Sequence, residues 1–186
     1  TMGLYPPGSV FKILVAGAGL QEGVVTPDTE FNDAGTVTAG GYVVRNYGDS
    51  VYGQHTFTEA LAKSINTTFA KVGVQLGNET LARYARDFGF DEDVPWPLGG
   101  AVSRFPDPAD MDKAHLAQAS FGQGEVLATP LEIALATSAV ANEGEIMKPY
   151  MVQRVLDYHQ NVLKETRPEV WLRPLTSDVA AQVRDL

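Results

Sequence analysis

The stretch "YPPGSVFKILVAGAGLQEG", Tyr5–Gly23, supports two incompatible predictions of the fold. From Lys12 onward, "KILVAGAG" is typical of a buried parallel strand that runs into a glycine-rich, nucleotide-binding turn. From Ser9 onward, the same residues predict a buried helix that carries a serine and a lysine one turn apart. The first prediction gives a dinucleotide-binding domain, and the second gives an enzyme with a serine nucleophile.

The glycine spacing argues against the nucleotide-binding turn. Gly17, Gly19 and Gly23 form G-x-G-x-x-x-G, which is one residue longer than the dinucleotide pattern. The helix that should follow is blocked, because "VVTPDTEFNDAG" places Pro27 and turn-forming residues there. The helix prediction fits better, and a retained dinucleotide would be the observation that favours the alternative.

Within the predicted helix, Ser9 and Lys12 are the polar side chains of an otherwise apolar run that continues to Ala18. Such a run predicts a helix buried in a domain. Burial lowers the pKa of a lysine, so that Lys12 could act as a base while Ser9 attacks a carbonyl. The helix N-terminus would favour the resulting oxyanion. A capping serine and a lysine that reaches solvent would also fit this short motif.

A second candidate element is Ser64-Ile65-Asn66, between the helical pieces of "EALAKSINTTFAKVG". A hydroxyl and a carboxamide two residues apart on a turn can reach into one cleft, although both are also ordinary turn residues. The three histidines are scattered and no G-x-S-x-G occurs, so no Ser-His-Asp triad competes.

The composition is that of one globular domain, with 44% apolar and 20% charged residues among 186. The absence of cysteine excludes thiol catalysis and thiolate metal sites. The net charge of −9, without a Lys/Arg-rich run, argues against nucleic acid as a partner. No metal or other cofactor is expected, and no apolar run approaches the ~20 residues of a membrane span.

Local signals predict several helices, with loops and hairpins between them. Capping-box spacing marks helix starts at Thr56 and at Thr129, where Pro130 adds a further start signal. A helix capped by Asn78 and another that starts in "TSDVAAQVRDL" are also expected. Gly122-Gln123-Gly124 is interpreted as a structural loop that leads to Pro130.

S-x-x-K followed by S-x-N is the signature pair of penicillin-binding proteins and serine β-lactamases. The strings "GLYPPGSVFK", "EALAKSINTTFAKVG" and "FGQGEVLATPLEIALATSAVANEGEIMKPYMV" resemble the transpeptidase domain of class B penicillin-binding proteins, of the actinobacterial penicillin-binding protein A type. The resemblance covers nearly the whole chain in order. β-Lactamases generally lack the last block, and β-lactam sensor domains match it less well.

The resemblance implies an α+β fold like that of serine β-lactamases and penicillin-binding transpeptidases. It implies that Ser9 is the acylated nucleophile, that Lys12 is its general base and that Ser64 relays the proton to the leaving group. Asn66 would bind the acyl-donor peptide and help to orient Lys12. The partners implied are peptidoglycan stem peptides that end in D-Ala-D-Ala, and β-lactams, which acylate the same serine.

The implied role is cell-wall cross-linking in cell shape or division, at the extracytoplasmic face of the membrane, in a membrane-anchored parent. A β-lactam-sensing or penicilloyl-binding module without cross-linking activity is the alternative. Turnover of a D-Ala-D-Ala peptide thioester would separate the two.

The chain departs from the family at its third motif, because K-T-G, K-S-G and H-T-G are all absent. The nearest string, Lys164-Glu165-Thr166, does not match. Residues 1–186 are therefore expected to be a partial transpeptidase domain, mainly its helical part with the central sheet largely missing. We expect one side of the Ser9–Leu20 helix to be open, other segments of the domain to pack there, and the piece alone to be inactive.

Overall fold

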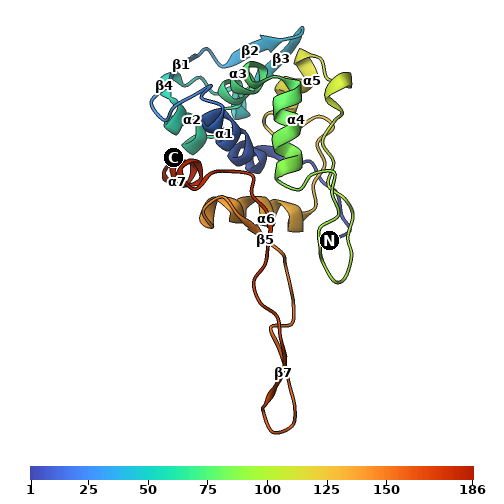
Figure 1. The fold of residues 1–186 in the computed structure, drawn as a ribbon. Coiled ribbons are helices and arrows are strands. Elements are labelled where there is room, and N and C mark those ends of the chain that lie inside the picture. The colour runs from blue at the N-terminus through green and yellow to red at the C-terminus, as the bar shows by residue number, and fades with distance from the viewer.

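In the computed structural model, which describes residues 1–186, helices form the body of the molecule and strands form small antiparallel pairs (Figure 1). The α+β prediction and the expected lack of a large sheet are confirmed, since every sheet has two strands. The α-helices are α1 (Lys12–Gln21), α2 (Phe57–Ala62), α3 (Asn66–Leu76), α4 (Asn78–Asp87), α5 (Lys113–Ala119), α6 (Pro130–Ala141) and α7 (Ser177–Asp185).

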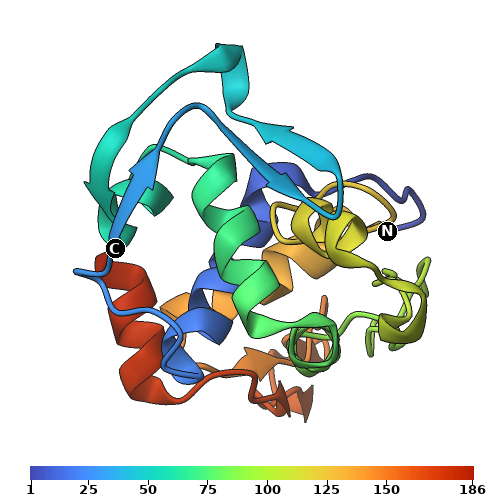
Figure 2. The ribbon, with the colours of Figure 1, turned by 90° about the horizontal axis from the view of Figure 1, so that it is seen from above.

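Two strand pairs lie together on one side of the body, and two lie beyond α6 (Figures 1 and 2). The first two are β1 (Glu30–Asp33) with β4 (Gly53–Thr56), and β2 (Thr36–Ala39) with β3 (Tyr42–Arg45). The others are β5 (Ile146–Met147) with β8 (Val170–Leu172), and β6 (Arg154–Leu156) with β7 (Val162–Glu165). Short 3₁₀ helices complete the set: η1 (Gly8–Phe11), η2 (Tyr47–Asp49) and η3 (Pro108–Asp110).

Helix α1 runs through the middle of the body, with α3, α6 and α7 around it (Figure 2). It contacts α3, α4 and α7, and its residues from Leu14 to Gly19 are buried. A Cβ on Gly17 would lie 2.8 Å from the Leu175 side chain, and one on Gly19 would lie 3.0 Å from Val25. These glycines therefore permit close packing inside a helix, and the nucleotide-binding turn is excluded.

The expectation that one side of this helix lies open is wrong for most of its length. Among the apolar residues of this segment, only Val10, with 45% of its surface exposed, and the half-buried Ile13 and Leu20 reach the surface. The reason is that α3, α4 and α7 of the same chain already pack around α1. The most exposed apolar residue of the segment, Val10, lies at the end of the helix that carries Ser9.

The predicted helix starts are confirmed at Thr56 and at Thr129, but only the first has a complete capping box. Thr56 and Glu59 form a complete capping box, in which each backbone N–H donates to the other side chain. At α6 the Glu132 N–H donates to the Thr129 hydroxyl at 3.0 Å, but the Glu132 side chain does not return to the helix start. The predicted cap at Asn78 is wrong, because its side chain donates to the Pro108 carbonyl and Gly77 precedes the helix.

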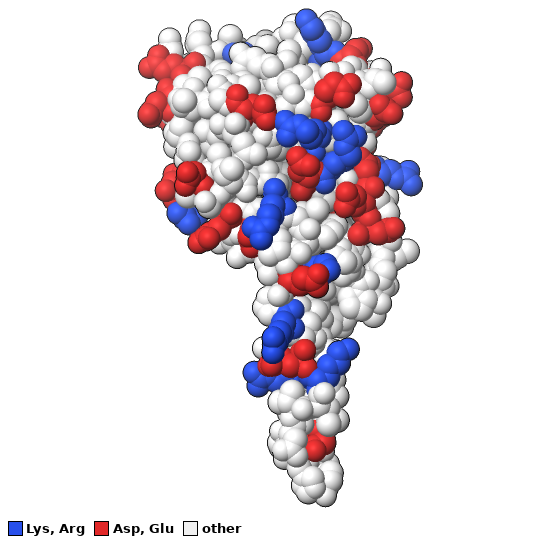
Figure 3. Space-filling model, viewed as in Figure 1, with Lys and Arg blue, Asp and Glu red and all other residues white.

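The β6–β7 hairpin projects away from the helices (Figure 1), and its strand residues are exposed. On the face shown in Figure 3, acidic and basic side chains are interspersed over the body and along this hairpin. The helices are too short or too polar for any of them to cross a membrane.

Glu132 is fully buried, and neither carboxylate oxygen has a hydrogen-bond partner in the chain. Its Oε1 atom would lie 2.6 Å from a Cβ on Gly89, so the carboxyl group fills space that only a glycine leaves free. Burial, and to a lesser extent the charge of Glu92, raises the pKa of Glu132 from 4.5 to about 7. The folded state therefore favours the protonated acid.

This raised pKa predicts a specific pH dependence of stability. Because the folded pKa lies above the unfolded one, the group does not destabilise the fold below 4.5, and its cost grows as the pH rises to about 7. In the wild type, this group should lower the free energy of unfolding by roughly 3 kcal/mol between acidic and mildly alkaline pH. Glu132→Gln should not show this decrease. Urea denaturation of the complete domain at several pH values measures this loss, and Glu92→Gln, which removes only the neighbouring charge, is the control. An unchanged pH slope in Glu132→Gln would contradict the assignment.

Candidate active site

Ser9 lies in η1, near the start of α1, and is exposed to solvent. The backbone before it is held by the loop at Gly122, whose carbonyl accepts a hydrogen bond from the Gly8 N–H at 2.8 Å. A Cβ on Gly122 would lie 2.2 Å from the Gly8 carbonyl oxygen, and the φ angle of Gly122 is +72°. The Gly122-Gln123-Gly124 loop therefore sets the backbone that presents Ser9.

The Ser9 hydroxyl does not cap the helix, so the capping interpretation of the motif is excluded. Ser9 is the second residue of a 3₁₀ helix, and its N–H has no backbone acceptor in the chain. An unpaired N–H at a helix start is suited to bind an oxyanion that forms at the Ser9 hydroxyl.

Lys12 is fully buried and does not reach solvent. Its Nζ atom lies 3.2 Å from Ser9 Oγ, 2.9 Å from Ser64 Oγ, 2.8 Å from the Ser64 carbonyl and 2.7 Å from Asn66 Oδ1. The structure thus brings together all four residues selected from the sequence, around a single amine.

Burial lowers the pKa of Lys12 to about 8, so the neutral amine is accessible near physiological pH. A neutral amine has two N–H donors and one lone pair. Asn66 Oδ1 and the Ser64 carbonyl can only accept, so they can accept hydrogen bonds from the two N–H groups of the amine. The lone pair of the nitrogen then remains available to a hydroxyl proton. The arrangement therefore allows Lys12 to take a proton from Ser9.

Ser64 occupies a backbone conformation that usually belongs to glycine, with φ of +55°. It ends α2 in a Schellman motif, because its N–H donates to the Leu61 carbonyl and the Ile65 N–H donates to the Ala60 carbonyl. In this left-handed conformation both the carbonyl and the hydroxyl of Ser64 face Lys12.

Asn66 is the first residue of α3, and both ends of its amide are engaged. Its Nδ2 atom donates to the Arg45 carbonyl at 3.0 Å, while Oδ1 accepts from Lys12. Because the Arg45 carbonyl can only accept, it fixes which end of the amide faces the lysine. The sequence offered no signal for Arg45, since its contribution comes from the backbone.

The family model for the penicillin-binding protein transpeptidase domain matches residues 1–186. The chain belongs to this family. Among its relatives, the peptidoglycan D,D-transpeptidase PbpA of Mycolicibacterium smegmatis is 34% identical over 98% of the chain and 38% of its own length. The chain thus spans well under half of the length of this relative.

Solved structures of the family have the same fold. The D,D-transpeptidase domain of a peptidoglycan glycosyltransferase from Eggerthella lenta superimposes with a TM-score of 0.94 at 32% identity, over 99% of this chain and 48% of that one. An imipenem acyl-enzyme complex of penicillin-binding protein A from M. tuberculosis gives 0.87 at 32% identity, over 98% and 42% of the two chains. The fold and family expected from the sequence are confirmed.

In this member of the family, Ser9 and Ser64 open onto a cleft of about 620 Å³. Its other walls are mostly apolar and come from η1, α1, α2, α6 and α7. The lining side chains other than the two serines are Val10, Ile13, Leu61, Thr137, Val140, Ala141, Val183 and Arg184.

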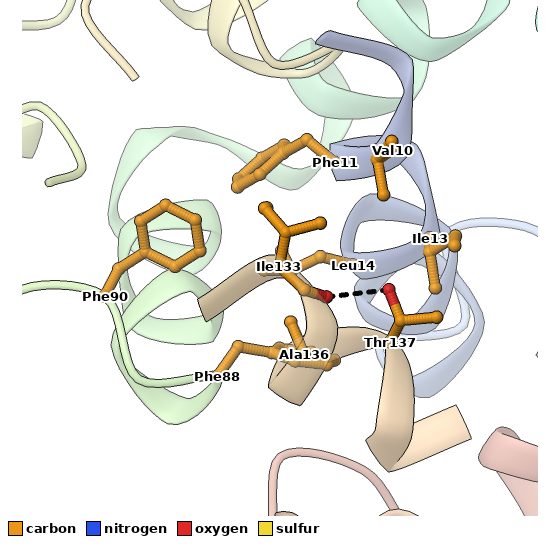
Figure 4. A pocket seen from close by; sticks show the side chains of 9 residues that line it. All are labelled: Val10, Phe11, Ile13, Leu14, Phe88, Phe90, Ile133, Ala136 and Thr137. Atoms are coloured by element: carbon orange, nitrogen blue, oxygen red, sulfur yellow. Dashed lines mark hydrogen bonds between the residues drawn. The ribbon is translucent and has the colours of Figure 1, made fainter. Parts of the chain in front are cut away.

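A second, apolar gap lies behind η1 and α1, where α6 packs against them (Figure 4). Val10, Ile13 and Leu14 face Ile133 and Ala136 across it, and its volume of about 10 Å³ is no larger than one water molecule. It is a packing defect next to the site and offers no polar group to a ligand except the Thr137 hydroxyl, which donates to the Ile133 carbonyl.

The histidines play no part in this site. His55 is buried, with its ring nitrogens bonded to the Gly53 carbonyl and the Thr68 hydroxyl, and His115 pairs with Asp112 on the surface. No group of histidine and acidic side chains is arranged to hold a metal ion.

The left-handed conformation of Ser64 predicts that Ser64→Gly and Ser64→Ala differ in stability but share a loss of function. Both remove the hydroxyl beside Lys12, and acylation by a penicillin should fall by about 10²-fold or more in both. The glycine variant should unfold at higher denaturant than the alanine variant, by roughly 1 kcal/mol, since a Cβ is strained at positive φ. Paired denaturation and acylation assays measure this, and equal stabilities would show that the conformation carries no strain.

Proposed function

We propose that this chain supplies the catalytic residues of a peptidoglycan D,D-transpeptidase that works through an acyl-enzyme on Ser9. The observation that carries the proposal is the buried Lys12 amine within 3.2 Å of Ser9 Oγ and 2.9 Å of Ser64 Oγ. The family and the name of the M. smegmatis relative support the class of reaction.

In the first step, Ser9 Oγ attacks the carbonyl carbon of the penultimate D-Ala of a stem peptide. The new C–O bond forms as the hydroxyl proton passes to Lys12 Nζ. The Ser9 N–H donates to the oxyanion of the tetrahedral intermediate. The C–N bond to the terminal D-Ala then breaks, and Ser64 passes the proton from Lys12 to the leaving nitrogen.

In the second step, an amine of a neighbouring peptide attacks the ester carbonyl and gives up a proton by the same route in reverse. The ester C–O bond breaks, an amide forms, and Ser9 regains its proton. A β-lactam undergoes only the first step efficiently, because its leaving nitrogen stays tethered in the opened ring. The acyl-enzyme complexes of the M. tuberculosis relative support this proposal for Ser9.

The cleft supplies the binding surface in this proposal. Asn66 uses the second Nδ2 hydrogen, which the Arg45 carbonyl does not take, to donate to a backbone carbonyl of the acyl-donor peptide. The apolar wall around Val10, Leu61 and Val183 contacts the side chains of that peptide. Because peptidoglycan lies outside the cytoplasmic membrane, the reaction is assigned to the extracytoplasmic face.

The decisive experiment is intact-protein mass spectrometry of the complete protein incubated with a penicillin. A single addition of the whole penicillin mass, mapped to the peptide that contains Ser9, is expected, and Ser9→Ala should show none. Lys12→Ala should slow the addition by about 10²–10⁴-fold, the usual value of general-base help. Lys12→Arg should not restore the rate, because arginine stays protonated near neutral pH.

An adduct on another residue, or rapid acylation of Lys12→Arg, would overturn these roles. Turnover separates the transpeptidase from the penicilloyl-binding module. The complete wild-type protein should release D-Ala from a D-Ala-D-Ala peptide and accept an amine, whereas a sensor would form the adduct without turnover.

Residues 1–186 alone are predicted to be far less reactive than the complete domain. The resemblance places the second oxyanion N–H on the strand that carries K-T-G, a motif absent from these residues. Losing one such donor costs about 10²–10³-fold in rate. Labelling of the isolated chain with a fluorescent penicillin measures this, with circular dichroism as the control for folding. A folded monomer that labels at the rate of the complete domain would refute the prediction.

A further inference from the structure

Helix α3 carries Asn66 at its first position but has no side-chain cap of its own. Its N-cap residue is Ile65, which offers no hydrogen-bond acceptor in its side chain. The N–H groups of the first helical turn need partners from elsewhere. The side chain of Asn46 supplies one, because its Oδ1 atom accepts from the Thr67 N–H at 3.1 Å.

Asn46 is itself held by a buried carboxylate. Its Nδ2 atom donates to Asp33 Oδ2 at 2.8 Å, and the Thr67 hydroxyl donates to Asp33 Oδ1 at 2.7 Å. The backbone N–H groups of Gly35 and Tyr52 also donate to this carboxylate. Asp33, Asn46 and Thr67 are at most 4% exposed, so they form a closed network.

The charge of this network is maintained in the folded state. Burial alone would raise the pKa of Asp33, but the hydrogen bonds from Thr67, Tyr52, Gly35 and Asn46 outweigh burial and hold that pKa below its ordinary value. A buried anion that faces the first turn of α3 is also favoured by the helix dipole.

The network meets the active site through two consecutive residues at the end of β3. The Arg45 carbonyl holds Asn66 Nδ2, while the Asn46 side chain holds the next N–H of the same helix. Together they fix both the position of Asn66 and the direction of its amide. Asn66 Oδ1 then contacts Lys12 Nζ at 2.7 Å.

We infer that Asp33, Asn46 and Thr67 are positioning residues, which hold Asn66 and through it Lys12 in the reactive arrangement. None of the three hydrogen-bonds to Ser9 or Lys12, and they act through the first turn of α3. This inference rests on the proposed function, since it assigns a role in the acylation of Ser9.

The test uses the complete protein, the rate of acylation by a fluorescent penicillin, and its dependence on pH. Asn46→Ala should lower the acylation rate by up to about 10²-fold, the cost of a small misplacement of a catalytic group. Thr67→Val should lower it less, and Thr67→Ser, which keeps the hydroxyl, should restore it.

The pH profile distinguishes positioning from a general loss of stability. Loss of the Asn66 acceptor disfavours protonated Lys12, so the acidic limb of the profile should shift to lower pH in Asn46→Ala and Thr67→Val. A variant that is only destabilised would have fewer active molecules, but the acidic limb of its pH profile would lie at the wild-type pH.

Thr68→Val is the matched control. Thr68 is the next residue of the same helix, is equally buried and loses a comparable hydrogen bond, from its hydroxyl to His55. Thr68→Val should therefore lower the stability of the fold. Its acylation rate and the acidic limb of its pH profile should stay as in the wild type. The inference would be overturned if Thr67→Val and Thr68→Val had the same acylation rate and pH profile. It would also be overturned if Asn46→Ala folded and kept the wild-type rate and pH profile. Neither outcome would affect the proposed function. Failure of the wild-type protein to acylate at Ser9 would instead overturn the proposed function on which it rests.

Discussion

The amine of Lys12 is buried at the start of an apolar helix, and it must find hydrogen-bond partners there. An unpaired buried charge is very costly, so Lys12 requires acceptors from outside its own helix. Ser64 and Asn66 provide three of them, from a turn more than 50 residues along the chain. Burial of Lys12 therefore fixes the relative position of α1, α2 and α3.

The chain meets this constraint with backbone conformations that few residues tolerate. Gly122 approaches the Gly8 carbonyl more closely than any side chain would allow, and Ser64 takes a left-handed conformation without being glycine. Both positions lie at or directly beside the candidate catalytic side chains. Strain concentrated at such positions, and held in place by the surrounding fold, is typical of sites whose geometry is set by function.

Sequence alone sufficed where the signal is local. The spacing of Ser9 and Lys12, the turn at Ser64 and the threonine caps are properties of a few neighbouring residues, and the four candidate residues selected from such patterns meet around Lys12 Nζ. The contribution of Arg45 is a backbone carbonyl, and that of Asn46 joins segments 21 residues apart, so neither has a local pattern. The sequence does not reveal that the Glu132 carboxyl is buried and unpaired, because capping-box spacing is the same whether the carboxyl returns to the helix start or points inward.

The pKa of Lys12 shows how burial suits its amine to the role proposed for it. With a pKa of about 8, roughly one molecule in ten holds a neutral lysine at pH 7, a cost of only about 1.4 kcal/mol. Burial is what lowers this pKa, whereas hydrogen-bond acceptors around the amine, Asn66 among them, favour its charged form. For the proposed role as a base, a buried amine without acceptors would be too weak to take a proton from serine, and a fully solvated amine would stay charged. In the proposed mechanism the fixed amide of Asn66 therefore acts twice, since it orients the amine and favours the protonated form that burial disfavours.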